Sequence, residues 1–233
     1  MSSSRLISRS LVFLPALAHV AAAQAPTASL TQGLATADSI IAAAIEHTIP
    51  GAVLVVSQNG QVIHERAFGW AELNDFQGRR LAQPRPMHTS TMFDLASVTK
   101  VMATTMAVMM LVSQNRIDVE SPVYRYLPDF RGPHLDSIRV RHLLQHSAGL
   151  VQWQPLYYHA SNEHATYDVI RHMPLQWGVG EGRHYSDLGF MLLGDIVEHV
   201  TGQPLDKYLA ESLYTPLGLR STTFVPKSWH PIG

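Results

Sequence analysis

The chain contains no cysteine, only three lysines and no long basic run, and each shortage excludes a class of protein. Without cysteine there is no disulfide, no thiol catalysis and no thiolate-bound metal. The formal net charge of -1 argues against a nucleic acid or an anionic membrane surface as partner. Hydrophobic residues make up 46% of the 233 residues, so we expect a folded core in one domain, or one domain with a subdomain.

The first 25 residues have the pattern of a secretory signal. Arg5 and Arg9 give a positive start, and residues 11–20 form an apolar stretch too short to cross a bilayer. Small residues at 21–25 offer a cleavage site. A short amphipathic helix is the alternative interpretation. We therefore predict export to the periplasm or the extracellular space, and a mature domain at 26–233.

The mature part opens with a predicted helix at 36–47, followed by a hairpin at 52–68. Asn59-Gly60 lies between two β-rich runs, which is the strongest short-range hairpin signal. The polar residues 71–92 are expected to form a loop. Further helices are expected at 95–114, 121–127, 139–146, 163–173, 188–200 and 204–213. Strands first and helices afterwards predict an α+β fold, with a small antiparallel sheet carrying a helical subdomain.

The most informative stretch is Phe-Asp-Leu-Ala-Ser-Val-Thr-Lys at 93–100, with the apolar run after it. Lys100 is the only charged residue between Asp94 and Arg116, so a buried helix is predicted to carry one ammonium near its start. That charge needs partners, or the amine must give up its proton. Ser97 precedes Lys100 by three residues, so both project from one helical face. A serine beside an amine and a helix N-terminus is a candidate activated nucleophile.

Other interpretations of this stretch stay open. Ser97 or Asp94 could simply cap the helix, and Lys100 could extend along its own stem to the surface. The run at 95–113 is close to the roughly 20 residues of a membrane span, which makes an anchored helical membrane protein a further hypothesis. The lysine and the hydroxyl groups within the run argue against a stable span.

A second candidate is the tetrapeptide His184-Tyr185-Ser186-Asp187, which precedes the predicted helix at 188–200. Ser186 or Asp187 is a preferred N-terminal cap, and capping alone would explain their presence. Tyr185 would then lie in the loop that leads into the helix. A phenol near an ammonium has a lowered pKa and can shuttle protons.

His142 and His146 are four residues apart, so both could face one metal ion from a helix. No glutamate lies between them and the sequence offers no obvious third ligand, so we favour a hydrogen-bonded helix end. The G-x-S-x-G, Walker A and G-x-G-x-x-G motifs are also missing from the sequence. We expect neither a metal nor a cofactor.

Taken together, these segments resemble the penicillin-recognising serine hydrolases: class C β-lactamases, D-alanyl-D-alanine carboxypeptidases of the same type and related esterases. The S-x-x-K at 97–100 and the Y-S-D at 185–187 carry the resemblance. Segments that agree in the same order from about residue 36 to the end are those at 50–53, 126–128, 142–150, 187–202 and 216–219. The resemblance implies a β-lactamase/transpeptidase-like fold, no cofactor, and a small-molecule or peptide substrate.

The resemblance also implies an acyl-enzyme mechanism on an amide or ester. Ser97 would attack a carbonyl, and its backbone N–H would be one donor of the oxyanion hole. Lys100, and Tyr185 as a phenolate, would take the serine proton and pass it to the leaving group. Asp187 would contact the substrate. The choice among a β-lactam, a D-Ala-D-Ala peptide and a simple ester is left open, as is the oligomeric state.

Two features depart from the family pattern. Asp187 stands where many members have asparagine, and a carboxylate only accepts hydrogen bonds, which favours an ester or peptide substrate over a β-lactam. A third motif, K-T-G or H-x-G on a returning strand, is not found before the chain stops at residue 233. We therefore expect missing C-terminal strands, a marginal hairpin and poor activity of this chain alone. A non-catalytic binding or scaffold homologue is the alternative.

Overall fold

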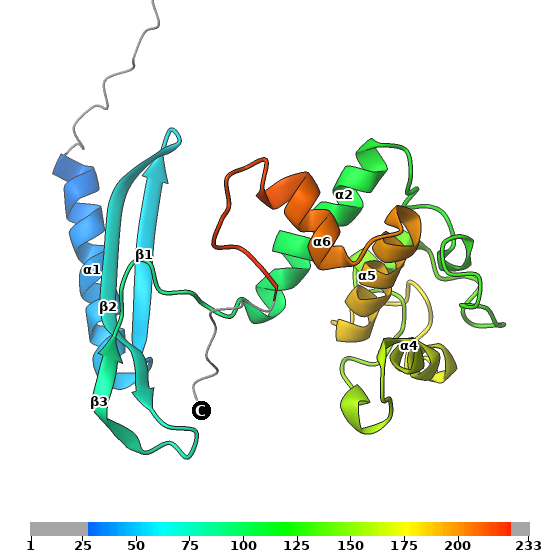
Figure 1. Cartoon of the computed structure of the whole chain (residues 1–233), viewed down its shortest axis with the longest axis horizontal. Coiled ribbons are helices and arrows are strands. Elements are labelled where there is room, and N and C mark those ends of the chain that lie inside the picture. The colour runs from blue at the N-terminus through cyan, green and yellow to red at the C-terminus, as the bar shows by residue number, and fades with distance from the viewer. Residues whose placement is uncertain (1–27, 225–233) are drawn as a thin grey trace, which may run out of the picture. The chain divides into compact units, whose positions relative to one another are not determined.

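The computed structural model describes residues 28–224, so the predicted signal at 1–25 lies outside the described residues. The chain divides into two compact units, which meet in sequence between Thr91 and Met92. The first unit holds the sheet and one long helix, and the second holds the remaining helices (Figure 1).

In the first unit, a helix is followed by three antiparallel strands in the order β1-β2-β3. The elements are α1 (Ala28–His47), β1 (Gly51–Gln58), β2 (Gln61–Asn74) and β3 (Arg80–Pro86). Asn59 and Gly60 both have positive φ, of 53° and 77°, as the tight hairpin turn requires. The predicted hairpin is therefore confirmed, and the helix begins earlier than predicted.

The expectation of a loop at 71–92 was wrong. Strand β2 continues to Asn74, and β3 pairs with it through Trp70 opposite Pro86 and Glu72 opposite Arg85. The two prolines of β3 hid the strand, but proline is tolerated where a strand lies at the edge of a sheet. An ion pair of 2.9 Å between Arg85 and Glu72 supports this edge pairing.

Helix α1 lies along the sheet and is tied to β2 by polar side chains (Figure 1). The Asp38 carboxylate is 2.8 Å from Nε2 of His64 and also pairs with Arg66. The hydrogen bond with His64 is the main reason why the pKa of Asp38 is lowered. His64 thus joins the helix to the sheet.

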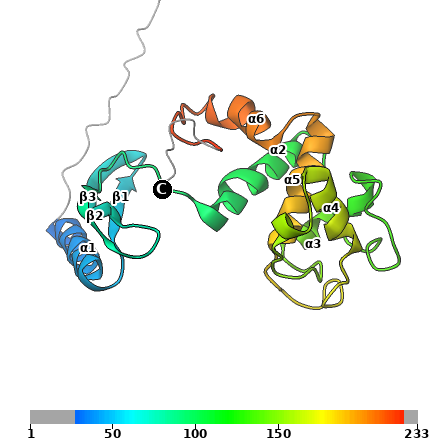
Figure 2. The ribbon, with the colours of Figure 1, turned by 60° about the horizontal axis from the view of Figure 1, so that its bottom comes forward.

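The second unit is a helical domain built around α5 (Asp187–Thr201). Its other helices are α2 (Thr105–Ser113), α3 (Val140–Leu144), α4 (Glu163–His172) and α6 (Leu205–Leu209). Short 3₁₀ turns lie at Ala96–Val98, Val123–Arg125 and Leu156–Tyr158, and π-helical turns at Lys100–Thr104 and Ala210–Tyr214. Helix α5 contacts α2, α3 and α6, as Figure 2 allows the reader to follow.

The helix predicted at 188–200 supplies a large part of the core of this unit. Leu188, Leu192, Leu193, Ile196 and Val197 are almost fully buried. Gly202 ends the helix in the left-handed conformation, with φ of 72°, as a C-terminal glycine commonly does. Burial of these large aliphatic side chains anchors α5 in the core. Tyr185 lies just before the start of this helix.

The helix predicted over 95–114 is less regular than expected. It begins as a 3₁₀ turn, passes through a π-helical turn and becomes α-helical only at Thr105. Only Ala103, Thr104 and three α2 residues are buried, so the helix presents one face to the core. Among the described residues, Ala96–Ser113 is the segment long and apolar enough to cross a membrane, a test that core helices of soluble proteins also pass.

Candidate active site

Ser97 lies in an unusual turn at the start of its helix. Ala96, just before it, has a φ of 43°, a left-handed conformation that is rare for a residue with a side chain. Oδ1 of Asp94 accepts a hydrogen bond from the Ala96 N–H at 2.8 Å and so holds the turn. Asp94, rather than Ser97, therefore satisfies this backbone group, and the Ser97 hydroxyl is left to other partners.

The structure brings Ser97, Lys100 and Tyr185 together, although Tyr185 is 88 residues away in sequence from Ser97. The Tyr185 hydroxyl is 2.8 Å from Oγ of Ser97 and forms a hydrogen bond with it. Lys100 donates a longer bond of 3.4 Å from Nζ to the same oxygen. The spacing of three residues thus puts the serine and lysine on one side, as predicted.

Asp187 forms an ion pair with the amine of Lys100. Its Oδ1 is 2.7 Å from Nζ of Lys100, and only 15% of the lysine side chain is exposed. Partial burial lowers the pKa of Lys100, but the hydrogen bonds with Asp187 and Tyr185 raise it by more, so the net pKa is above its usual value. Of the two outcomes predicted for this amine, the structure shows partners rather than loss of the proton.

The same contacts have the opposite effect on the phenol. The hydrogen bond with Lys100 is the largest cause of a lowered pKa at Tyr185, and the bond with Ser97 adds to it. The charge of Asp187 acts against this shift. At a pH where Tyr185 ionises, Lys100 is therefore still an ammonium, and its charge favours the phenolate.

The start of helix α5 sets the positions of Tyr185 and Asp187. Ser186 is its N-cap: Oγ accepts a hydrogen bond from the Gly189 N–H at 3.3 Å and donates one to the Val151 carbonyl at 2.7 Å. The alternative that Asp187 caps the helix is thereby decided in favour of Ser186. Asp187 is free to turn its carboxylate toward Lys100.

The ring nitrogens of His142 and His146 bind backbone groups. Nδ1 of His142 accepts from the Arg139 N–H at 3.1 Å, and Nδ1 of His146 accepts from the Ser186 N–H at 3.0 Å. Helix α3 ends at Leu144, earlier than predicted, and His146 follows in the left-handed conformation. Among residues 28–224 no group of three or more potential ligands gathers, so the two histidines act in hydrogen bonding here.

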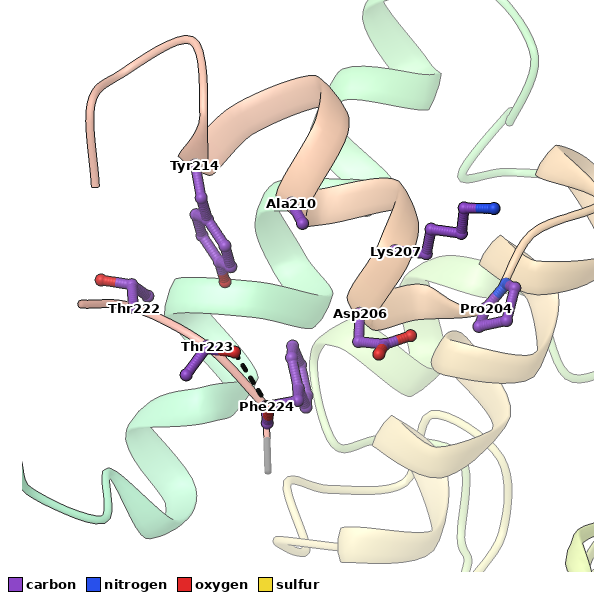
Figure 3. A pocket seen from close by; sticks show the side chains of 8 residues that line it. All are labelled: Pro204, Asp206, Lys207, Ala210, Tyr214, Thr222, Thr223 and Phe224. Atoms are coloured by element: carbon purple, nitrogen blue, oxygen red, sulfur yellow. Dashed lines mark hydrogen bonds between the residues drawn. The ribbon is translucent and has the colours of Figure 1, made fainter. Parts of the chain in front are cut away.

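A pocket of about 330 Å³ lies elsewhere in the second unit, between α6 and residues 222–224 (Figure 3). Tyr214 and Phe224 line it, together with Asp206 and Lys207. Tyr214 also donates a 3.2 Å hydrogen bond to the Met102 carbonyl, which links this region to the helix of Lys100. Ser97, Lys100 and Tyr185 do not line the pocket.

Comparison with known proteins now identifies the family. Residues 30–228 match the family described as Beta-lactamase. The chain belongs to this family. In sequence it is 40% identical over 210 residues to the N-acetylmuramyl-L-alanine amidase of Bacillus subtilis (strain 168), and the match covers 84% of this chain and 47% of the relative.

Solved structures of other proteins share the fold. A class C beta-lactamase in complex with cefoxitin has a TM-score of 0.70 and 25% identity, over 84% of this chain and 53% of that one. EstCE1, a hydrolase with promiscuous acyltransferase activity, has a TM-score of 0.67 and 30% identity, over 81% and 52%. The predicted β-lactamase-like α+β fold is confirmed. The chain spans about half the length of these relatives.

Sequence reasoning missed the part played by His146. Its polar partner is Ser186, 40 residues later in the chain, and no local pattern connects the two. The left-handed φ of His146 was equally hidden, because most histidines do not adopt this conformation, although histidine is enriched in it. Asp187 was predicted to contact substrate, and its ion pair with Lys100 was not foreseen.

Proposed function

We propose that this member of the beta-lactamase family is an exported serine hydrolase that acts through an acyl-enzyme on an amide or ester. The observation that carries the proposal is the hydrogen-bonded cluster of Ser97, Tyr185 and Lys100, with oxygen–oxygen and nitrogen–oxygen distances of 2.8 and 3.4 Å. A nucleophile within hydrogen-bond reach of a base, which is itself held by a third group, is the arrangement that covalent catalysis needs.

In the proposed reaction, the Tyr185 phenolate takes the proton of Ser97 while Oγ attacks the substrate carbonyl carbon. The tetrahedral intermediate collapses when the protonated phenol gives its proton to the leaving amine or alcohol. Water then attacks the acyl group, Tyr185 takes a proton from it, and the acid leaves as Ser97 regains its hydrogen. Lys100 remains an ammonium throughout and stabilises the phenolate, a role that its raised pKa supports.

The backbone N–H of Ser97 would be one donor to the developing oxyanion. Such a donor is typically worth about 3 kcal/mol of transition-state stabilisation. The strained turn at Ala96 is the local feature that would direct this N–H, since left-handed residues often persist where the surrounding structure fixes them for function.

For the substrate, we propose an ester or peptide-like amide rather than a β-lactam. Asp187 offers only acceptor oxygens, and one of them is held by Lys100, so the residue has no amide donor for a substrate carbonyl. The Bacillus subtilis relative is named as an amidase of N-acetylmuramyl-L-alanine, and the secretory pattern of residues 1–25 agrees with a target outside the cytoplasm.

The test is covalent labelling of the protein as expressed from its gene. A fluorescent fluorophosphonate and a fluorescent penicillin should each be offered to the wild type, to Ser97→Ala and to Ser113→Ala, a serine at the end of the same helix. We expect the fluorophosphonate to form an adduct with the wild type and with Ser113→Ala but not with Ser97→Ala, and the penicillin to label all three weakly or not at all. Labelling that survives Ser97→Ala would disprove the proposal. Binding without any acylation would instead favour a non-catalytic homologue.

A further inference from the structure

His146 binds the backbone on both sides of Tyr185. Its carbonyl accepts the N–H of His184 at 2.7 Å, and Nδ1 of its ring accepts the N–H of Ser186 at 3.0 Å. The backbone N–H groups of the residues before and after the tyrosine are therefore both held by one residue from another part of the chain. Such a pair of bonds fixes the backbone of Tyr185 in two places.

The ring of His146 also supports the phenol side chain directly. Its centroid is 4.6 Å from that of Tyr185 and 5.0 Å from that of Phe190 in α5, with interplanar angles of 32° and 34°. These separations are typical of favourable aromatic contacts. His146 itself is 7% exposed, whereas Tyr185 is 42% exposed, so the buried ring is the firm side of this contact.

The backbone of His146 has an unusual left-handed conformation. Its φ is 56°, in the left-handed region, which an ordinary side chain adopts only at an energetic cost. This left-handed residue follows the end of α3. Its carbonyl and its ring nitrogen accept the hydrogen bonds from His184 and Ser186 on either side of Tyr185. Residues held in such conformations commonly cluster at functional sites.

We propose that His146 is the positioning residue that holds Tyr185 beside Ser97 and Lys100. It acts through Tyr185, by two backbone hydrogen bonds and one ring contact, and not on the substrate. The geometric claim stands on these contacts alone, while its catalytic consequence rests on the proposed function.

The proposal requires a neutral imidazole, because Nδ1 must accept the Ser186 N–H. Burial is the main reason why the pKa of His146 is lowered, and the charges of Arg183 and Lys100 lower it further. The Ser186 hydrogen bond and the charge of Asp187 oppose the shift. At neutral pH the acceptor is therefore present. In acid, a proton on Nδ1 would face the Ser186 N–H, and the two donors would separate.

The experiment measures the ionisation of Tyr185 by NMR of protein carrying ¹³Cζ-tyrosine, with Tyr185→Phe to assign the signal. Two variants of His146 are matched. His146→Asn keeps an acceptor near the Nδ1 position, and asparagine tolerates the left-handed backbone. His146→Phe keeps a ring but has no acceptor. If the two His146 hydrogen bonds position the phenol beside Lys100, the wild type and His146→Asn should show a lowered phenol pKa.

His146→Phe should raise that pKa by about one unit, a tenfold change in the phenolate fraction at a given pH. An unchanged phenol pKa in His146→Phe would overturn the proposal, as would an equal rise in His146→Asn. Should His146→Phe fail to fold by circular dichroism, His146→Gln serves in its place, because its side-chain oxygen lies beyond the Nδ1 position. The readout needs no turnover, so absent labelling of a wild type with a lowered phenol pKa would refute the proposed function alone.

Discussion

The ammonium of Lys100 lies 2.7 Å from the carboxylate of Asp187, closer than its 3.4 Å approach to Oγ of Ser97. The two charges fix each other, so the lysine is set up to hold a proton rather than to remove one. The neighbouring phenol feels the positive charge and becomes the more acidic group. The ion pair therefore shifts the pKa values of two side chains, to which the resemblance gave a joint role, in opposite directions.

The first prediction concerns the pH dependence of labelling. The phenolate of Tyr185 is the proposed base, and its pKa is lowered below the usual 10.0, so the labelling rate should rise with pH and level off before an ordinary tyrosine ionises. The rate should fall again only where Lys100 loses its proton, above its usual 10.5, because its pKa is raised. First-order rates of fluorophosphonate labelling across pH would measure both limbs. A rising limb that persists unchanged in Tyr185→Phe would contradict this assignment.

The second prediction concerns Asp187→Asn. The carboxylate charge raises the pKa of Tyr185, so its removal should lower the phenol pKa further and move the rising limb of labelling to lower pH. The pKa of Lys100 should fall as well, because it loses its ion-pair partner. Asp206→Asn, in the first turn of α6, serves as the control and should leave the profile in place. A shift of the rising limb to higher pH in Asp187→Asn would contradict the claim that the Asp187 charge raises the pKa of Tyr185.

The third prediction compares two glycines with the same backbone. Gly149 and Gly180 have φ of 79° and 81°, but a Cβ on Gly149 would lie 2.2 Å from the Trp177 carbonyl oxygen, whereas one on Gly180 meets nothing within 4 Å. Alanine at either position should cost about 1–2 kcal/mol of strain in the left-handed conformation. Gly149→Ala should cost about 1–3 kcal/mol more, because the crowded backbone must move.

Urea unfolding followed by circular dichroism would give both free energies of unfolding. Equal losses for the two variants would mean that the backbone around Trp177 yields without cost. Gly149 follows His146 by three residues. A backbone shift at Gly149 is therefore expected to disturb the His146 hydrogen bonds next to Tyr185.

Much of the fold followed from local chemistry. The Asn59-Gly60 turn required positive φ at both residues, and the apolar residues of α5 required burial, so both features could be predicted. Strand β3 could not, because its prolines oppose a strand in isolation and are acceptable only at the edge of a sheet. The irregular start of the Ser97 helix was equally hidden, since nothing local signals a left-handed alanine.

For the site, the sequence alone determined that Ser97 and Lys100 share a face, because the helical repeat returns to the same side after three residues. It also placed Tyr185 and Asp187 at the start of the next long helix. Only the tertiary structure decided that Asp187 forms an ion pair with Lys100 and that His146 hydrogen-bonds the backbone next to Tyr185. The partners are 87 and 40 residues apart in sequence, and their pairing depends on distances that no local pattern encodes.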